Sequence, residues 1–112
     1  MDKSKSLNDY FPFFDSFLRS RKLRFGIVLN HKDVRFELWL MGQNAEDQRN
    51  YWELLKDAKW NKGRSVMPRY SVLEVVLVEA PDFNDLDTLS AEIINRGISV
   101  TEEIQDFIKR IE

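Results

Sequence analysis

The sequence contains no cysteine, and this absence excludes disulfide bonds, cysteine-ligated zinc sites and thiol catalysis. Its single histidine, His31, excludes a metal site built from several histidines. No apolar run approaches the roughly 18 residues that a membrane-spanning helix needs. The first ten residues, MDKSKSLNDY, have no apolar stretch after the lysines and so do not form a signal peptide. We therefore expect a cytoplasmic protein with no membrane association, no cofactor and no metal.

Basic residues are scarce in the last third of the chain. Residues 1–73 hold 14 basic and 9 acidic residues, a net charge of +5, whereas residues 74–112 hold 3 basic and 10 acidic residues, a net charge of −7. Two basic runs, at residues 19–24 and 59–69, contain no acid. A net charge of −2 for the whole chain disfavours a dedicated nucleic-acid binder, so we interpret these runs as solvated faces.

The clearest structural pattern is a β-hairpin made of residues 24–29 and 34–41. With a turn inside residues 30–33, Leu29 lies opposite Val34, and six apolar side chains share one face of the hairpin. The other face then carries Arg24, Gly26 and Val28 against Trp39, Glu37 and Arg35.

Two helices and a further extended segment are predicted around this hairpin. A helix over residues 44–59 begins with Asn44 as N-cap and buries Tyr51 and Trp52. A shorter helix over residues 15–22 uses Asp15 as its N-cap. The apolar residues 10–14 include a proline at position 12, which indicates an edge strand or the first turn of a helix.

The second half of the chain predicts one more strand and two helices. Residues 71–79 are β-branched and almost continuously apolar, which is typical of a strand buried on both faces. Helices are expected at residues 85–95 and 100–111, because Gly97 between them suits a helix end. A single kinked helix is the alternative, since the apolar spacing nearly keeps its phase across this glycine.

These elements together predict a single α+β domain over residues 1–112, with residues 1–8 disordered. Its sheet has three or four mostly antiparallel strands with helices packed on it. Neither an internal repeat nor a low-complexity segment divides the chain.

The polar face of the hairpin is the candidate binding site, formed by Arg24, Arg35, Glu37 and Trp39. The expected register places Glu37 opposite Gly26, whose missing side chain leaves space beside the Trp39 indole. A carboxylate, guanidinium groups and an indole could bind a ligand there, or could form an ordinary cross-strand charge ladder. No residue of the chain is predicted to be catalytic or to bind a metal.

Three other groups of residues have simpler interpretations. His31 in the hairpin turn is expected to be solvent-exposed. Trp60 follows the end of the predicted helix 44–59 and is expected to reach the surface. The acidic residues at positions 79, 82, 85 and 87 could hold Mg²⁺ or Ca²⁺, but a turn at Asp82 and a helix cap at residue 84 or 85 explain them better.

The segment YFPFFDSFLRSRKLRFGIVLNHKDVRFELWLMGQNAEDQRNYWELLK resembles a bacterial protein family of unknown function. The resemblance covers residues 9–95 and includes the later PDFNDLDTLSAEI. It implies a fold and a bacterial cytosolic setting, and no mechanism. Members of that family often carry a further helix before the region of Tyr10, which implies a packing layer that is absent here or is supplied by a partner.

A fainter resemblance is to restriction-endonuclease-like nucleases, whose strands carry an aspartate and then Glu-x-Lys. The matching triplet here is Glu37-Leu38-Trp39, in which tryptophan stands where the lysine is needed. The expected function is therefore a non-catalytic module that binds a ligand, a protein partner or a second copy of itself. The alternative is a degenerate or metal-dependent nucleic-acid-processing fold.

Overall fold

Four strands and three helices follow one another in a simple order along the chain. The computed structural model describes the backbone of residues 8–13 and all of residues 16–112. The elements are β1 (Asn8–Phe13), α1 (Ser16–Ser20), β2 (Leu23–Asn30), β3 (Arg35–Gly42), α2 (Ala45–Leu55), the 3₁₀ turn η1 (Lys59–Asn61), β4 (Leu73–Val78) and α3 (Leu86–Ile111). The predicted disorder of residues 1–8 lies outside the described residues, apart from residue 8, which begins β1.

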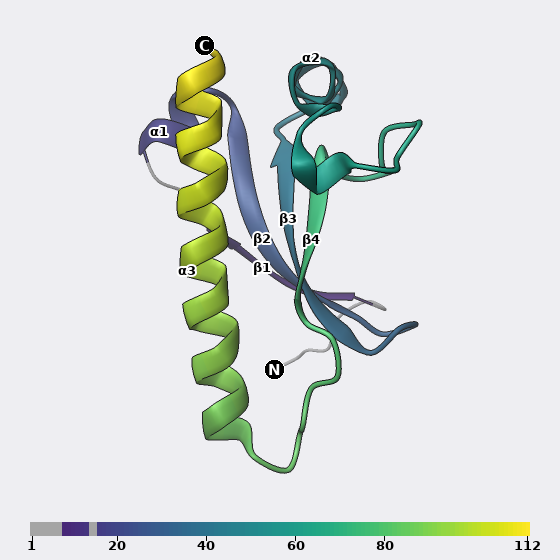
Figure 1. Ribbon diagram of the computed structural model, residues 1–112, viewed down its shortest axis with the longest axis vertical. Helices are drawn as coiled ribbons and strands as arrows, with labels where there is room; N and C mark the ends of the chain where they lie inside the picture. The colour runs from purple at the N-terminus through teal and green to yellow at the C-terminus, as the bar shows by residue number, and fades with distance from the viewer. Residues whose placement is uncertain (1–7, 14–15) are drawn as a thin grey trace.

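The strands form one antiparallel sheet whose order, β1-β2-β3-β4, is the order of the chain (Figure 1). The predicted α+β class and the antiparallel sheet are confirmed. Residues 10–13 of the predicted proline-containing segment fall in β1, an edge strand, which is the first of its two predicted forms, and residue 14 lies outside the described residues. A proline is tolerated there because an edge strand has one side without a ladder of hydrogen bonds.

The faces of the β2–β3 hairpin were predicted correctly, but its register is shifted by two residues. Leu29 lies opposite Phe36 instead of Val34, and Asn30 lies opposite Arg35. The turn takes the four residues 31–34, because the Asn30 side-chain oxygen accepts hydrogen bonds from the backbone N–H groups of residues 32 and 33, at 3.0 and 3.1 Å. A shift of two leaves the side chains of β2 and β3 on their predicted faces, since strand side chains alternate with a period of two. Val34 is the exception, because it lies in the turn and is 50% exposed instead of beginning the second strand on the apolar face.

One face of the sheet carries the core. Phe25, Leu40 and Leu73 lie opposite one another across three strands, and all three are fully buried. Helix α3 covers this face with Val100, Ile104 and Ile108, while α1 and α2 each add a leucine at its margin, Leu18 and Leu55. Burying a side chain of this size contributes about 1.5–3 kcal/mol, so this layer supplies most of the apolar stabilisation.

Strand β4 is shorter than the predicted strand 71–79 and is not buried on both faces. It spans Leu73–Val78 and forms the sheet edge opposite β1. Glu74, Val75 and Val76 in its middle are only half-buried. Its continuous apolar sequence, which is typical of a central strand, therefore misled the prediction.

The two helices predicted at residues 85–95 and 100–111 are one helix, α3, of 26 residues. Gly97 does not end it, because this glycine lies buried against the sheet inside the helix. A Cβ built there would come within 3.9 Å of Ile27 Cδ1 and 4.0 Å of Leu77 Cδ1, so Gly97 marks where α3 approaches the strands. None of the helices formed by the described residues is long and apolar enough to cross a membrane.

The shorter helices keep their predicted places with different ends. Helix α1 covers residues 16–20, and the predicted cap Asp15 lies outside the described residues. Asn44 caps α2 as predicted, its side chain accepting from the residue 47 N–H at 2.9 Å. Helix α2 ends at Leu55 rather than at residue 59. The buried Asn61 side chain donates a hydrogen bond from Nδ2 to the Leu55 carbonyl at 3.0 Å, which satisfies the end of the helix where the chain leads into η1.

Replacement of Gly97 by alanine is expected to stabilise the fold by about 1 kcal/mol, the difference between glycine and alanine inside a helix. The added methyl group meets only ordinary van der Waals contacts. Gly42→Ala is the opposite case, because its Cβ would lie 2.6 Å from the backbone nitrogen of Gln48. We expect Gly42→Ala to cost about 1–3 kcal/mol. Urea unfolding of both variants measures the difference, and a destabilised Gly97→Ala protein would contradict the described packing of α3.

Candidate functional site

The predicted binding residues centre on Glu37, a carboxylate buried in the sheet face that points away from α3. Glu37 is 2% exposed. Its Oε1 accepts a hydrogen bond from Trp39 Nε1 at 2.7 Å, and its Oε2 accepts from Arg35 Nε at 2.7 Å and from Asn30 Nδ2 at 3.1 Å. We call these four residues the Glu37 cluster. Both carboxylate oxygens thus accept hydrogen bonds, one at Oε1 and two at Oε2.

The strand geometry brings the Glu37 cluster together. Residues 35, 37 and 39 alternate onto the same face of β3, and Asn30 joins them because it lies opposite Arg35 at the end of β2. Asn30 was missed from the sequence, since the expected register placed it inside the turn. The sequence predicted that Glu37 lies opposite Gly26. In the structure Trp39 lies opposite Gly26, and Glu37 lies opposite Val28.

Arg24, the fourth predicted site residue, does not meet Glu37. It lies opposite Met41, four residues along β2 from Val28, which corresponds to about 13 Å of strand. The expected register, with Glu37 opposite Gly26, placed Arg24 only two residues along β2 from the partner of Glu37, and that placement is wrong by the same two-residue shift.

The charges of the Glu37 cluster reinforce one another. Burial raises the pKa of the Glu37 carboxyl, but the hydrogen bonds from Trp39, Arg35 and Asn30 outweigh it, so the pKa is lowered overall. The pKa of Arg35 is raised, mainly by its hydrogen bond to Glu37. Arg35 also lies 3.9 Å from an Asp33 oxygen and 3.7 Å from a Glu79 oxygen. A carboxylate held ionised in this way is a poor general acid or base near neutral pH.

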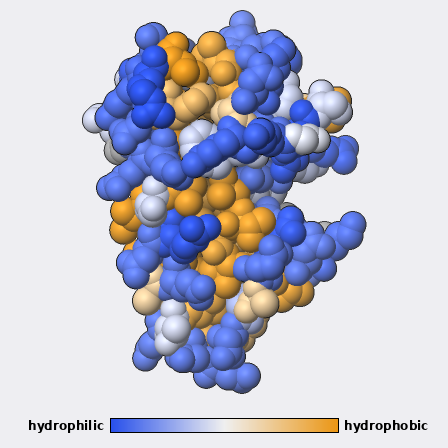
Figure 2. Space-filling view, viewed as in Figure 1, coloured by the Kyte–Doolittle hydropathy of each residue, from blue (hydrophilic) through white to orange (hydrophobic). Residues whose placement is uncertain are grey.

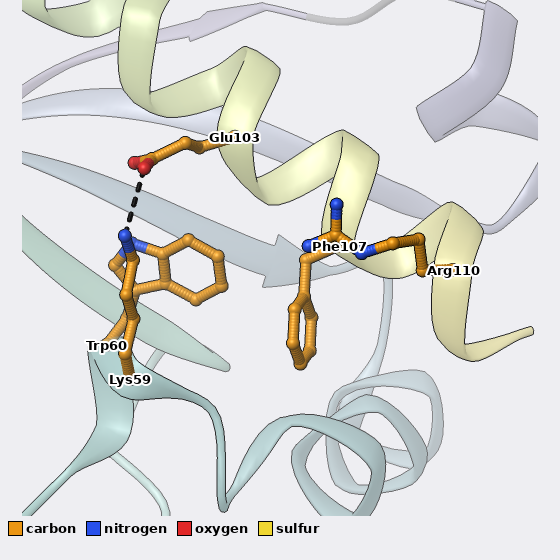
Figure 3. A pocket seen from close by; sticks show the side chains of 5 residues that line it. All are labelled: Lys59, Trp60, Glu103, Phe107 and Arg110. Atoms are coloured by element: carbon orange, nitrogen blue, oxygen red, sulfur yellow. Dashed lines mark hydrogen bonds and ion pairs between the residues drawn. The ribbon is translucent and has the colours of Figure 1, made fainter.

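A second group of side chains forms an open pocket between η1 and the C-terminal half of α3 (Figure 3). The pocket has a volume of about 280 Å³ and is lined by Lys59, Trp60, Glu103, Phe107 and Arg110. The Trp60 and Phe107 rings meet edge to face, with centroids 5.5 Å apart. We call it the Trp60–Phe107 pocket.

Charged groups surround these two rings. Lys59 Nζ is 2.9 Å from Glu103 Oε2 and 5.4 Å from the Trp60 ring centroid. The Arg110 guanidinium lies 5.9 Å from the Phe107 centroid, and no carboxylate among the described residues pairs with it. The pocket thus combines two aromatic walls with a cation available to an anion.

The sequence indicated only part of this pocket. Trp60 was predicted to reach the surface, and it is half-buried. Phe107 was assigned to the apolar stripe of the C-terminal helix, where it belongs. Their contact was missed because they are 47 positions apart in the sequence and no local periodicity links them.

The other residues considered from the sequence have structural roles or lie at the surface. His31 is exposed at the hairpin tip, and Trp52 is buried, as predicted. Asp85 caps α3, accepting from the Thr88 N–H at 3.2 Å. Within residues 8–13 and 16–112, no three His, Cys, Asp or Glu side chains gather closely enough to hold a metal ion.

Comparison with known proteins gives one match. The family described as a domain of unknown function, DUF7000, matches residues 8–108, which include the whole sheet, the Glu37 cluster and most of α3. Of the Trp60–Phe107 pocket, only Arg110 lies beyond the matched residues. The chain belongs to this family. This agrees with the resemblance to a family of unknown function, while no match supports the likeness to nucleases. Neither the curated proteins nor the solved structures contain a match.

Replacement of Glu37 by glutamine is expected to destabilise the fold by about 3 kcal/mol, because it removes the buried charge that binds Arg35 at 2.7 Å and leaves Arg35 only the longer contacts to Asp33 and Glu79. The lowered pKa of Glu37 makes its contribution pH-dependent. The contribution is complete above the unfolded-state pKa of about 4.3 and is lost as the pH falls through the lower folded-state value.

Urea unfolding between pH 3 and pH 7 tests this, with Glu53→Gln as control, since Glu53 forms an exposed ion pair with Lys56. That control is expected to change stability by less than about 1 kcal/mol. A difference between Glu37→Gln and the unmodified chain that stays the same across this pH range would argue against an ionised Glu37.

Proposed function

We propose that this protein is a small non-catalytic binding module of the bacterial cytosol, and that it binds a planar anionic small molecule in the Trp60–Phe107 pocket. The observation that carries the proposal is the meeting of two aromatic rings beside Arg110, a cation with no carboxylate partner among the described residues. Ligand sites in proteins combine apolar walls with a few polar groups that orient the ligand.

The chemistry of the lining defines the ligand class. The edge-to-face pair of Trp60 and Phe107 offers one ring face to a planar group. Arg110 favours a carboxylate or a phosphate, because its guanidinium matches both in geometry and charge. Lys59 is held by Glu103 and contributes less to an anion. A ring that carries one carboxylate or phosphate group therefore suits the pocket best.

The lack of catalysis rests on the Glu37 cluster. Its one buried carboxylate accepts three hydrogen bonds and is 2% exposed, so a substrate has little access to it, and its lowered pKa does not suit proton transfer near neutral pH. Arg35 and Trp39 are half-buried and could still contact a ligand, whereas Glu37 would act only by positioning them.

The alternative, a degenerate nucleic-acid-processing fold, has less support. Its metal would have to replace hydrogen bonds on Glu37, and Trp39 occupies the position of the required lysine and donates to that same carboxylate. An increase in Tm with Mg²⁺ and duplex DNA together would favour this alternative.

The proposal is tested with benzoate and phenyl phosphate as probes and benzamide as the uncharged control. We expect a Kd of about 1 mM for the anions, worth about 4 kcal/mol, and binding at least tenfold weaker for benzamide. The readout is the indole N–H resonance of Trp60, which is assigned by its loss in Trp60→Phe and so distinguished from those of the other two tryptophans.

Two variants separate the pocket from non-specific anion binding. Arg110→Gln is expected to abolish the preference for the charged probes, while Arg49→Gln, which removes an equal charge from the exposed surface of α2, leaves it unchanged. Equal weakening by both variants, or binding of benzamide as tight as that of benzoate, would overturn the proposal.

A further inference from the structure

The two edges of the sheet differ in how they are protected against further strand pairing. The β1 edge contains a proline, a residue that has no N–H to donate and that commonly guards edge strands. The β4 edge, with the sequence LEVVLV, has no proline or lysine and a single charge, Glu74. Within the described part of the chain, no strand pairs with the outer side of β4. Such an edge is a template for another strand.

The surface beside β4 is apolar. Figure 2 shows hydrophobic surface gathered along the middle of the view, over β4 and beside α3, between hydrophilic margins. A hollow of about 220 Å³ nearby is lined by Ile27, Phe36, Ser90, Ile93 and Ile94. Ile94 and Ile98 are each more than half exposed, and Phe83, in ring contact with Phe36, is 47% exposed. An apolar surface of this kind beside an open edge favours a protein partner.

The charges at the two ends of β4 identify the partner. The chain entering β4 carries the basic residues at positions 59, 62, 64 and 69, and the chain leaving it carries the acidic residues at positions 79, 82, 85 and 87. Lys62 and Arg69 form no ion pair with any described residue. When a strand pairs with an antiparallel copy of itself, the basic end of each copy lies beside the acidic end of the other.

We propose that this protein forms a homodimer in which β4 pairs antiparallel with β4 of a second copy about a two-fold axis. The two four-stranded sheets then form one continuous antiparallel sheet. A two-fold axis normal to the sheet keeps every side chain on its own face, so it passes through residue 75 or residue 76 and not between them. In either register Arg69 of each copy lies within one position of the partner of Asp82 in the other copy, close enough for the two side chains to pair. Charge and strand direction are thus complementary in the same arrangement.

Formation of the dimer breaks few contacts that the β4 edge makes within the single chain. Arg96 of α3 donates to the Val76 carbonyl at 3.4 Å, a long and therefore weak hydrogen bond. Val75 and Val76, half-buried in the single chain, become covered by the second strand. The dimer would thus bury the two valines in the middle of β4 that the single chain leaves half-buried.

A charge-exchange experiment tests this arrangement. Sedimentation equilibrium from 5 to 500 µM measures the dimer dissociation constant of the unmodified chain, of Arg69→Glu, of Asp82→Arg and of the double variant. Each single reversal is expected to weaken dimerisation about tenfold, because two-fold symmetry repeats the repulsion at both ends. The double variant is expected to restore it. Both residues are exposed, and Asp82→Arg removes one hydrogen bond, from the Asn84 N–H to Asp82 Oδ1 at 2.9 Å, in the turn before α3. The Tm of each variant therefore checks that the fold is retained.

Arg49→Glu on the exposed surface of α2 is the matched control, and it is expected to leave the dissociation constant unchanged. Amide hydrogen exchange in β4 should slow as the protein concentration rises. A chain that stays monomeric at 500 µM overturns the proposal and leaves the edge to a strand of another protein. A dimer that the two reversals weaken no more than Arg49→Glu does, or that forms without protecting the β4 amides, overturns it as well.

Discussion

The close contact between α3 and the sheet at Gly97 is the constraint on which the rest of the structure depends. The helix lies against β2 and β4 there, with Ile27 Cδ1 and Leu77 Cδ1 only 3.9 and 4.0 Å from the position of a Cβ, so the contact has room for a methyl group and little more. From that point its buried residues continue in both directions along the apolar face of the sheet, with Leu89 on one side and Ile104 on the other. The same helix presents Phe107 to Trp60 and Ile94 to the apolar hollow, so the position of α3 determines both surfaces proposed for binding.

The Glu37 cluster imposes a second constraint, on the opposite face of the sheet. A buried carboxylate is tolerated only when its hydrogen-bond capacity is used, and here an indole, a guanidinium and an amide use it. Two of these donors come from β3 itself and the third from the end of β2. The cluster therefore ties the hairpin together in one register, and a slip of the strands would leave the Glu37 charge without its partners.

The sequence predicted those features that repeat with a short period and missed those that depend on contact. The alternation along residues 35–39 was enough to assign each side chain to a face. The register was not predictable, because the four-residue turn ends at Val34 with φ of 50°, a conformation that β-branched residues rarely adopt. For Gly97 the same residue type suits a helix end and a close helix–sheet contact, and only the neighbouring strands distinguish the two. The Trp60–Phe107 contact had no local pattern at all.

The order of the sheet has a consequence for how the chain acquires its structure. Each strand pairs with the strand that precedes it in the chain, and only the pairing of β4 with β3 spans a long segment, which contains α2 and η1. The β2–β3 hairpin closes over four residues and can form within about 1–10 µs, earlier than the rest of the sheet. Strand β4 adds to this hairpin after α2, and α3 follows last along the chain. Without α3, the apolar face that carries Phe25 and Leu40 would be open to water, so the hairpin alone cannot bury its apolar side chains.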